Sequence, residues 1–130
     1  MILDSSVIVA ITTKEPEAHA AGMVIGQAEA VSIGTPTLVE SGMVLAGRPG
    51  ADWRALLDEF FAETEAAVIP FSSDHWRVAV NAFEKFGKGR HPARLNLGDC
   101  FTYAVARVAG QPVLHLGNDF NQTDLMVISL

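Results

Sequence analysis

Short apolar runs alternate with longer amphipathic stretches along the whole chain, and this alternation limits the available folds more than any other feature. Each run is only three or four residues long and apolar on both faces, as expected for a strand covered on both sides of a sheet. Strands that alternate with helices predict an α/β fold with a mostly parallel sheet. We expect one domain, residues 1–130, with about five short strands at residues 1–3, 30–33, 67–70, 112–115 and 126–129.

The stretches between these runs carry helix signals. Residues 51–65 place large apolar side chains, among them Trp53 and Phe60, on one face of a helix. Residues 5–12 are too continuously apolar for periodicity to decide between strand and helix. Residues 87–95 are rich in glycine and positive charge, which predicts a loop. Further helices are expected at residues 15–28, from a cap at Thr35 or Thr37 to Ala46, at 73–86 with Ser72 or Ser73 as cap, and from Asn96 to Ala109.

Composition is that of a well-packed globular chain. With 49% hydrophobic and 18% charged residues, the chain can form a core, and disorder is not expected. No apolar stretch approaches the roughly 18 residues of a membrane span. Residues 1–10 lack the basic flank of a signal peptide, and the single cysteine, Cys100, can form no internal disulfide. These features lead us to expect a cytoplasmic protein with Cys100 as a small buried residue.

Four acidic residues that lie far apart in sequence are placed by this pattern at one end of the predicted sheet. Asp4 directly follows the first strand, and Asp119 follows the fourth by a few residues. Glu40 and Asp99 lie in the first turns of helices that begin near the same end. Sites in parallel sheets lie at the carboxyl ends of the strands, and clustered carboxylates repel one another unless a cation lies between them. We therefore expect a divalent-metal site and metal-dependent phosphodiester cleavage.

Each carboxylate also has a purely structural explanation. Residues 37–40 match a capping box with Glu40 bonding back to the cap, and residues 96–99 have the same spacing. Asp119 follows Gly-Asn and could form a turn. Asp4 is the hardest to explain this way, because it interrupts an apolar run in which an unpaired charge would be unfavourable to bury.

Four short motifs carry a resemblance to a known family. They are Met-Ile-Leu-Asp-Ser-Ser at residues 1–6, Thr-Pro-Thr-Leu-Val-Glu at 35–40, Leu-Gly-Asp-Cys-Phe at 97–101 followed by Tyr103-Ala104, and Gly-Asn-Asp-Phe at 117–120 followed by Thr123-Asp124. In their order and spacing they resemble the PIN-domain family, and specifically VapC-type toxins of toxin–antitoxin pairs. The resemblance covers almost the whole chain. It implies a three-layer α/β/α sandwich and a metal-dependent endoribonuclease.

The resemblance also assigns site residues. Asp4, Glu40 and Asp99 match the family's three core acids. The fourth acid in many PIN domains lies in a Thr-x-Asp-x-Asp-Phe pattern, from which this chain departs by carrying histidine in the threonine slot and glycine at the first aspartate. We take Asp119, in the Asp-Phe pair, as the fourth acid and keep Asp124 as a substitute or supporting residue. The remaining supporting position is Ser6, which matches a hydroxyl or amide position beside the metal site.

The groups present define the expected chemistry. Carboxylate oxygens suit Mg²⁺ or Mn²⁺ rather than zinc. One or two such ions can activate an attacking water, stabilise the developing charge and assist the leaving oxygen. No Ser-His-Asp or Cys-His pattern supplies a competing nucleophile. The preference for RNA follows from the resemblance, since this chemistry needs no 2′-hydroxyl.

Expected partners are RNA, an antitoxin and a second copy of the chain. The net charge of −6 opposes nucleic-acid binding, yet four of the nine Lys and Arg residues cluster as Lys85, Lys88, Arg90 and Arg94. This segment is either a solvated loop or a basic lip that holds RNA phosphates. The resemblance implies a cognate VapB-like antitoxin and a homodimer, and the apolar helix faces at residues 53–61 and 76–86 agree with a dimer.

Two alternatives belong to other classes. A haloacid-dehalogenase-type phosphatase also begins from an aspartate after the first strand, but it requires a second aspartate where this chain has Ser6. A catalytically silent PIN-fold interaction module would keep the fold and bind a partner without binding metal. The retention of all three core acids argues against such a module.

Overall fold

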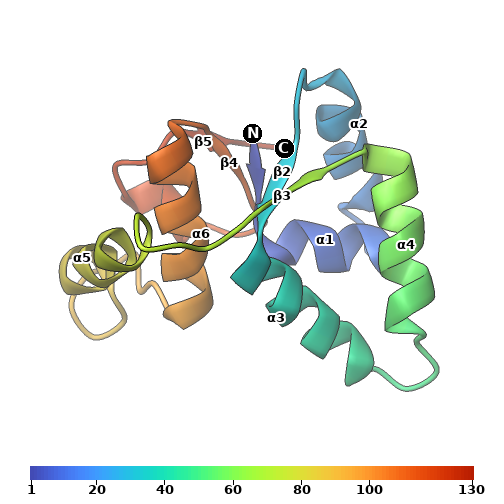
Figure 1. Cartoon of the computed structure of the whole chain (residues 1–130), viewed down its shortest axis with the longest axis horizontal. Helices are drawn as coiled ribbons and strands as arrows, with labels where there is room; N and C mark the ends of the chain where they lie inside the picture. The colour runs from blue at the N-terminus through green and yellow to red at the C-terminus, as the bar shows by residue number, and fades with distance from the viewer.

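A five-stranded parallel sheet forms the centre of the protein in the computed structural model, which describes residues 1–130 (Figure 1). The strands are β1 (Ile2–Leu3), β2 (Ser32–Gly34), β3 (Ala67–Ile69), β4 (Val113–Leu114) and β5 (Val127–Ile128). They lie in the order β3-β2-β1-β4-β5, and every neighbouring pair is parallel. The predicted α/β fold with about five short strands is therefore confirmed.

Helices cover both faces of this sheet. They are α1 (Ser5–Thr12), α2 (Ala18–Gln27), α3 (Thr35–Ala46), α4 (Trp53–Thr64), α5 (Trp76–Phe86), α6 (Leu97–Ala109) and the short 3-10 helix η1 (Phe120–Gln122). Figure 1 shows α5 and α6 on one side of the sheet and α1, α2 and α4 on the other. Helix α3 leaves the end of β2 and contacts α1, α4 and α6. None of the helices has the length and apolarity needed to cross a membrane.

Alternating side chains of the central strands enter two separate cores. Ile2 and Val113 belong to the core that includes α5 and α6, whereas Leu3 and Leu114 belong to the core that includes α1, α2 and α4. All four are at most 1% exposed, and burying one such side chain contributes about 1.5–3 kcal/mol. A sheet that is apolar on both faces is thus stable only between two helical layers, which explains the three-layer arrangement.

Residues 5–12, which the apolar pattern leaves undecided, form α1. The chain turns from strand to helix at Asp4, whose side chain accepts a hydrogen bond from the backbone N–H of Ser6 and so caps the helix. The predicted helix at residues 15–28 is shorter and begins at Ala18. Pro16 lies two residues before this start.

The predicted caps of two other helices are wrong. Helix α3 begins directly at Thr35 after Gly34 and has no side-chain cap, while Thr37 is buried and shares a 3.1 Å hydrogen bond with Thr102 of α6. Helix α5 begins at Trp76 after His75, again without a side-chain cap. The hydroxyl of Ser72 instead lies 3.1 Å from Nδ1 of His75. Thr37 thus has a tertiary partner in place of the predicted capping role, whereas the contact of Ser72 with His75 is local.

The strand order reverses beside β1. From β1 the chain adds β2 and then β3 on one side, and it crosses to the other side to add β4 and β5. In parallel sheets, the segments that follow the two strands at such a switch point diverge, which leaves room for a site at the carboxyl ends of the strands. Asp4 follows β1 directly, and the segment that contains Asp119 follows β4.

Candidate metal centre at the carboxyl edge of the sheet

Asp4 is the buried centre of the site. Its Oδ2 accepts hydrogen bonds from the backbone N–H and the hydroxyl of Ser6, at 3.1 and 2.7 Å, and its Oδ1 accepts one at 2.9 Å from the hydroxyl of Thr102. The Ser6 hydroxyl in turn accepts a 3.0 Å hydrogen bond from the backbone N–H of Leu116 after β4. Three donors thus compensate a carboxylate that is only 6% exposed. They also fix its orientation.

Glu40 approaches from α3. The hydroxyl of Ser5 donates a hydrogen bond to its Oε1, and the carboxylate lies against the backbone of Gly98 in the first turn of α6. The predicted capping box of residues 37–40 is wrong, because α3 begins three residues earlier than that box requires and Thr37 bonds to Thr102. Glu40 is therefore free to reach across to α6.

Asp99 serves two purposes at the start of α6. The predicted capping box is confirmed, since Asp99 accepts a 3.0 Å hydrogen bond from the backbone N–H of Asn96 and Asn96 accepts a 2.9 Å hydrogen bond from that of Asp99. Burial, and to a smaller extent the charges of Asp4, Asp119 and Glu40, nevertheless raise the pKa of Asp99 to about 6, although the hydrogen bond from Asn96 lowers it. Asp99 thus caps α6 and is at the same time close enough to the three other acids for their charges to affect its pKa.

Asp119 and Asp124 occupy different surroundings. Asp119 is exposed just before η1, next to Phe120, which is buried and packs edge-on against His115 at 4.9 Å. Asp124 accepts a 2.6 Å hydrogen bond from the hydroxyl of Tyr103, and its Oδ2 lies 3.5 Å from Arg107. Its charge is not among those that raise the pKa of Asp99. Asp119 thus lies within electrostatic range of Asp99, whereas Asp124 is held by Tyr103 and Arg107.

The fit of a divalent cation can be judged from these contacts. No three acidic, histidine or cysteine side chains lie in a ligand arrangement around one common point. Mg²⁺ keeps several of its waters and commonly uses one or two protein carboxylates, so a closed cage of side chains is not required. The donors are hard carboxylate oxygens, and Asp99 carries unrelieved repulsion from three like charges. This donor set fits a partly hydrated Mg²⁺ or Mn²⁺.

The basic segment lies between α5 and α6. Residues 87 and 95 pair as an isolated bridge and close the loop that contains Lys88, Arg90 and Arg94, all of which are exposed. The guanidinium of Arg90 lies 5.3 Å from the ring centre of Phe83. Lys85 differs, because its Nζ is 3.9 Å from Asp124. Three of the four cations are thus without an acidic partner.

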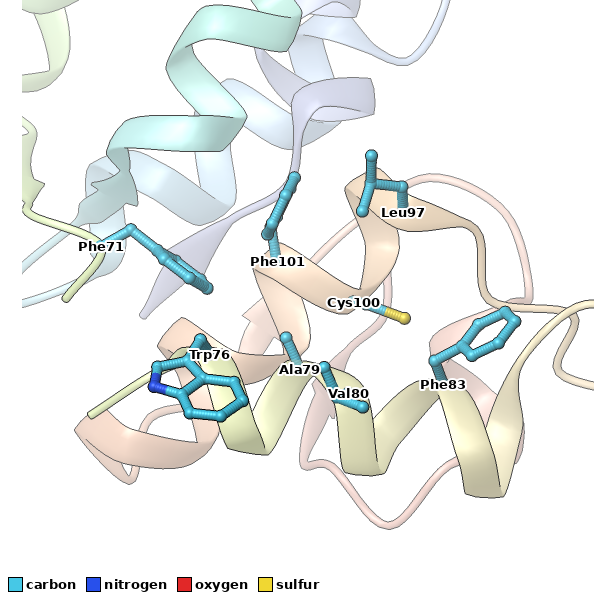
Figure 2. Close-up of a pocket in the computed structure, with 8 residues that line it drawn as sticks. All are labelled: Phe71, Trp76, Ala79, Val80, Phe83, Leu97, Cys100 and Phe101. Carbon is cyan, nitrogen blue, oxygen red and sulfur yellow. The ribbon is translucent and has the colours of Figure 1, made fainter. Parts of the chain in front are cut away.

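Two largely apolar grooves lie beside α6 and α3, the helices that carry Asp99 and Glu40. One, of about 390 Å³, lies between α5 and α6, and Figure 2 shows its lining residues: Phe71, Trp76, Ala79, Val80, Phe83, Leu97, Cys100 and Phe101. The other, of about 690 Å³, lies between α3 and α4 and includes Met43, Trp53 and Phe61 beside Arg54 and Asp58. Cys100, buried as predicted, lines the first groove.

Sequence reasoning missed three contributors to the site: Ser5, Gly98 and Thr102. Ser5 and Gly98 were visible within the family-like motifs but carried no signal of their own. Thr102 is a polar residue in an otherwise apolar, buried stretch of α6. That single polar position was the only local sign that a buried acceptor, which the structure identifies as Asp4, needed a hydrogen-bond donor from α6.

The fold and the site have counterparts among known proteins. The sequence matches the PIN domain over residues 1–125, and the chain belongs to the PIN-domain family. Ribonuclease VapC36 of Mycobacterium tuberculosis is 40% identical over 126 residues, which cover 96% of this chain and 91% of that protein. Within the PIN-domain family, the chain therefore belongs to the VapC ribonucleases.

Solved structures agree on the fold. VapBC2 from Rickettsia felis, bound to a DNA fragment from their promoter, superposes with a TM-score of 0.79 at 13% identity, covering 98% of this chain and 96% of that one. VapC20 of Mycobacterium tuberculosis, a sarcin-ricin loop cleaving toxin, has a TM-score of 0.72 at 20% identity, covering 96% and 95%. The predicted PIN-like fold is thus confirmed.

Proposed function

We propose that this chain, as a single PIN domain, is a Mg²⁺- or Mn²⁺-dependent endoribonuclease and the toxin of a type II toxin–antitoxin pair. One observation carries the proposal: the pKa of Asp99, raised first by burial, is raised further by the charges of three acids that arrive from other parts of the chain. A fold has no structural use for such a cluster without a cation. The 40% identity to a named VapC ribonuclease supports RNA as the substrate.

Asp4, Glu40, Asp99 and Asp119 would hold the metal, which when bound supplies activation of the attacking water and stabilisation of the developing charge. The chain's own residues provide the geometry. Ser6 and Thr102 donate to Asp4 and leave its charge fixed in direction. Ser5 does the same for Glu40. Fixed ligands of this kind need little reorganisation during the reaction, which is how preorganised sites favour the transition state.

Lys88, Arg90 and Arg94 would hold the phosphates of the RNA. They are exposed and without an acidic partner, so their charges are available to a polyanion. The loop that bears them leads directly into the first turn of α6, where Asp99 lies. Lys85 is a weaker candidate because it already lies near Asp124.

The antitoxin would bind the groove between α3 and α4. An amphipathic helix can place apolar anchors against Met43, Trp53 and Phe61, while Arg54 and Asp58 offer polar contacts at the rim. A Lys or Arg that follows this helix would pair with the acids and replace the metal as the compensating charge. VapBC2 of Rickettsia felis, which has the same fold, pairs a VapC protein with a VapB protein, and this supports a VapB-like partner here.

A second copy of the chain would cover the groove between α5 and α6. Its lining is apolar throughout, and Trp76 and Leu97 are 51% and 72% exposed. Homodimer interfaces are more apolar than other interfaces. The mixed polar lining of the α3–α4 groove makes it less suited to this role.

The test is cleavage of a labelled RNA by the purified chain with Mn²⁺ and with EDTA, alongside Asp4→Asn. Cleavage only with metal, and only by the unsubstituted chain, is expected. The alternative of a silent interaction module has one observation in its favour, which is that the acids' oxygens already accept hydrogen bonds from Ser5, Ser6, Thr102 and Asn96. A silent module would show no rise of Tm with Mn²⁺.

A further inference from the structure

Gly98 is the one helical glycine at which the position of a β-carbon is taken by a charged group from another element, the carboxylate of Glu40. A β-carbon at residue 98 would lie 2.9 Å from Cδ of Glu40, 3.1 Å from Oε1 and closer still to Oε2. By contrast, a β-carbon at Gly22 or Gly26 of α2 would meet nothing within 4 Å. The backbone of Gly98 does not have a positive φ, so its conformation does not require glycine.

We propose that Gly98 is a positioning residue, whose missing β-carbon leaves the space in which the Glu40 carboxylate lies beside Asp99. This inference rests on the proposed function for its consequence, because Glu40 is one of the four acids assigned to the metal. Ser5 holds the same carboxylate through a hydrogen bond to Oε1. The hydroxyl of Ser5 and the bare backbone of Gly98 together determine where the Glu40 charge lies.

A side chain at residue 98 would displace the Glu40 carboxylate but would not disturb the fold. The atoms that an alanine would displace are the far end of the flexible Glu40 side chain, which can rotate away without moving any backbone. Alanine is also favoured over glycine in a helix, both by propensity and by the lower conformational freedom of the unfolded chain. Gly98→Ala should therefore give a stable protein with a displaced acid.

A double-mutant cycle separates this role from a general effect on the helix. The four proteins are the unsubstituted chain, Gly98→Ala, Glu40→Ala and the double variant, with Gly26→Ala as the matched helical control. Mn²⁺ binding is measured by calorimetry, and unfolding in urea is measured in EDTA. Glu40→Ala is chosen over Glu40→Gln because glutamine has the same shape and would still meet the new β-carbon.

We expect Gly98→Ala to weaken Mn²⁺ binding about tenfold or more when Glu40 is present. It should have no effect on Mn²⁺ binding in the Glu40→Ala background, because no carboxylate is left to displace. In EDTA, Gly98→Ala should raise the urea midpoint more in the Glu40→Ala background than in the unsubstituted chain. The Gly26→Ala control should leave Mn²⁺ binding unchanged in both backgrounds.

Equal loss of Mn²⁺ affinity in both backgrounds, or no loss when Glu40 is present, would overturn the inference. If the unsubstituted chain binds no Mn²⁺ at all, the proposed metal site fails, and the urea measurements alone decide the role of Gly98. Non-additive urea midpoints would then support the placement of Glu40 by Gly98. Additive midpoints would overturn it.

Discussion

Replacing Asp99 by asparagine should stabilise the metal-free protein at neutral pH. Burial, and then the charges of Asp4, Asp119 and Glu40, raise the pKa of Asp99 from 3.8 to about 6. The folded protein therefore binds this proton more tightly than the unfolded chain does. Stability from this group is complete below pH 3.8, declines as the pH rises, and is lost above about pH 6.

The magnitude follows from the size of the shift. A rise from 3.8 to about 6 corresponds to roughly 3 kcal/mol of unfavourable free energy for the ionised form. Asp99 keeps some contact with solvent, which screens part of this energy. We therefore expect Asp99→Asn to raise the free energy of unfolding by about 1–2 kcal/mol at pH 7.5. Asparagine retains a side-chain oxygen that can accept the hydrogen bond from the backbone N–H of Asn96, so the cap is preserved.

The assay is urea unfolding in EDTA between pH 4 and 8. The difference in stability between Asp99→Asn and the unsubstituted chain should be small near pH 4 and reach its full size above pH 6. The matched control is Asp124→Asn. Burial tends to raise the pKa of Asp124, but the Tyr103 hydrogen bond and the charge of Arg107 outweigh it and lower that pKa. Its removal should therefore destabilise the protein at pH 7.5. An Asp99→Asn protein that is no more stable than the unsubstituted chain at pH 7.5 would refute the account of clustered, repelling acids.

Three further outcomes are expected. Asp4→Asn should abolish metal-dependent RNA cleavage while circular dichroism stays unchanged, because the amide oxygen still accepts from Ser6 and the Thr102 hydroxyl can turn to accept from the amide NH₂, while the charge is lost; full activity would contradict the metal-nuclease proposal. Neutralising Lys88 and Arg90 together should reduce the salt slope of RNA binding by about 1.4 without altering Mn²⁺ affinity, and an unchanged slope would mean that the loop is only solvated surface. Co-expression with the product of the adjacent gene should yield a co-purifying, inactive complex, and failure to co-purify, with host growth equally unaffected, would remove the support for a toxin–antitoxin pair.

Much of the fold follows from local sequence pattern. The alternation of short apolar runs and amphipathic stretches predicted the parallel sheet and its two helical layers, because a strand that is apolar on both faces must be covered on both sides. The capping box of residues 96–99 was also predictable, since every group in it lies within four residues of the chain. Asp4 was recognisable as a charge that interrupts an apolar run.

The tertiary structure alone decided how the acids are arranged. Asp119 and Asp124 lie five residues apart with similar sequence surroundings, and Tyr103 and Arg107 on α6 determine that Asp124 faces away. Glu40 does not form the predicted cap. Its carboxylate instead accepts a hydrogen bond from Ser5 of α1 and lies against the backbone of Gly98 of α6. Local pattern reports the preferences of neighbouring residues. The partners of these carboxylates lie 35 or more residues away or on a different helix, so they are set by which helices pack together at the edge of the sheet.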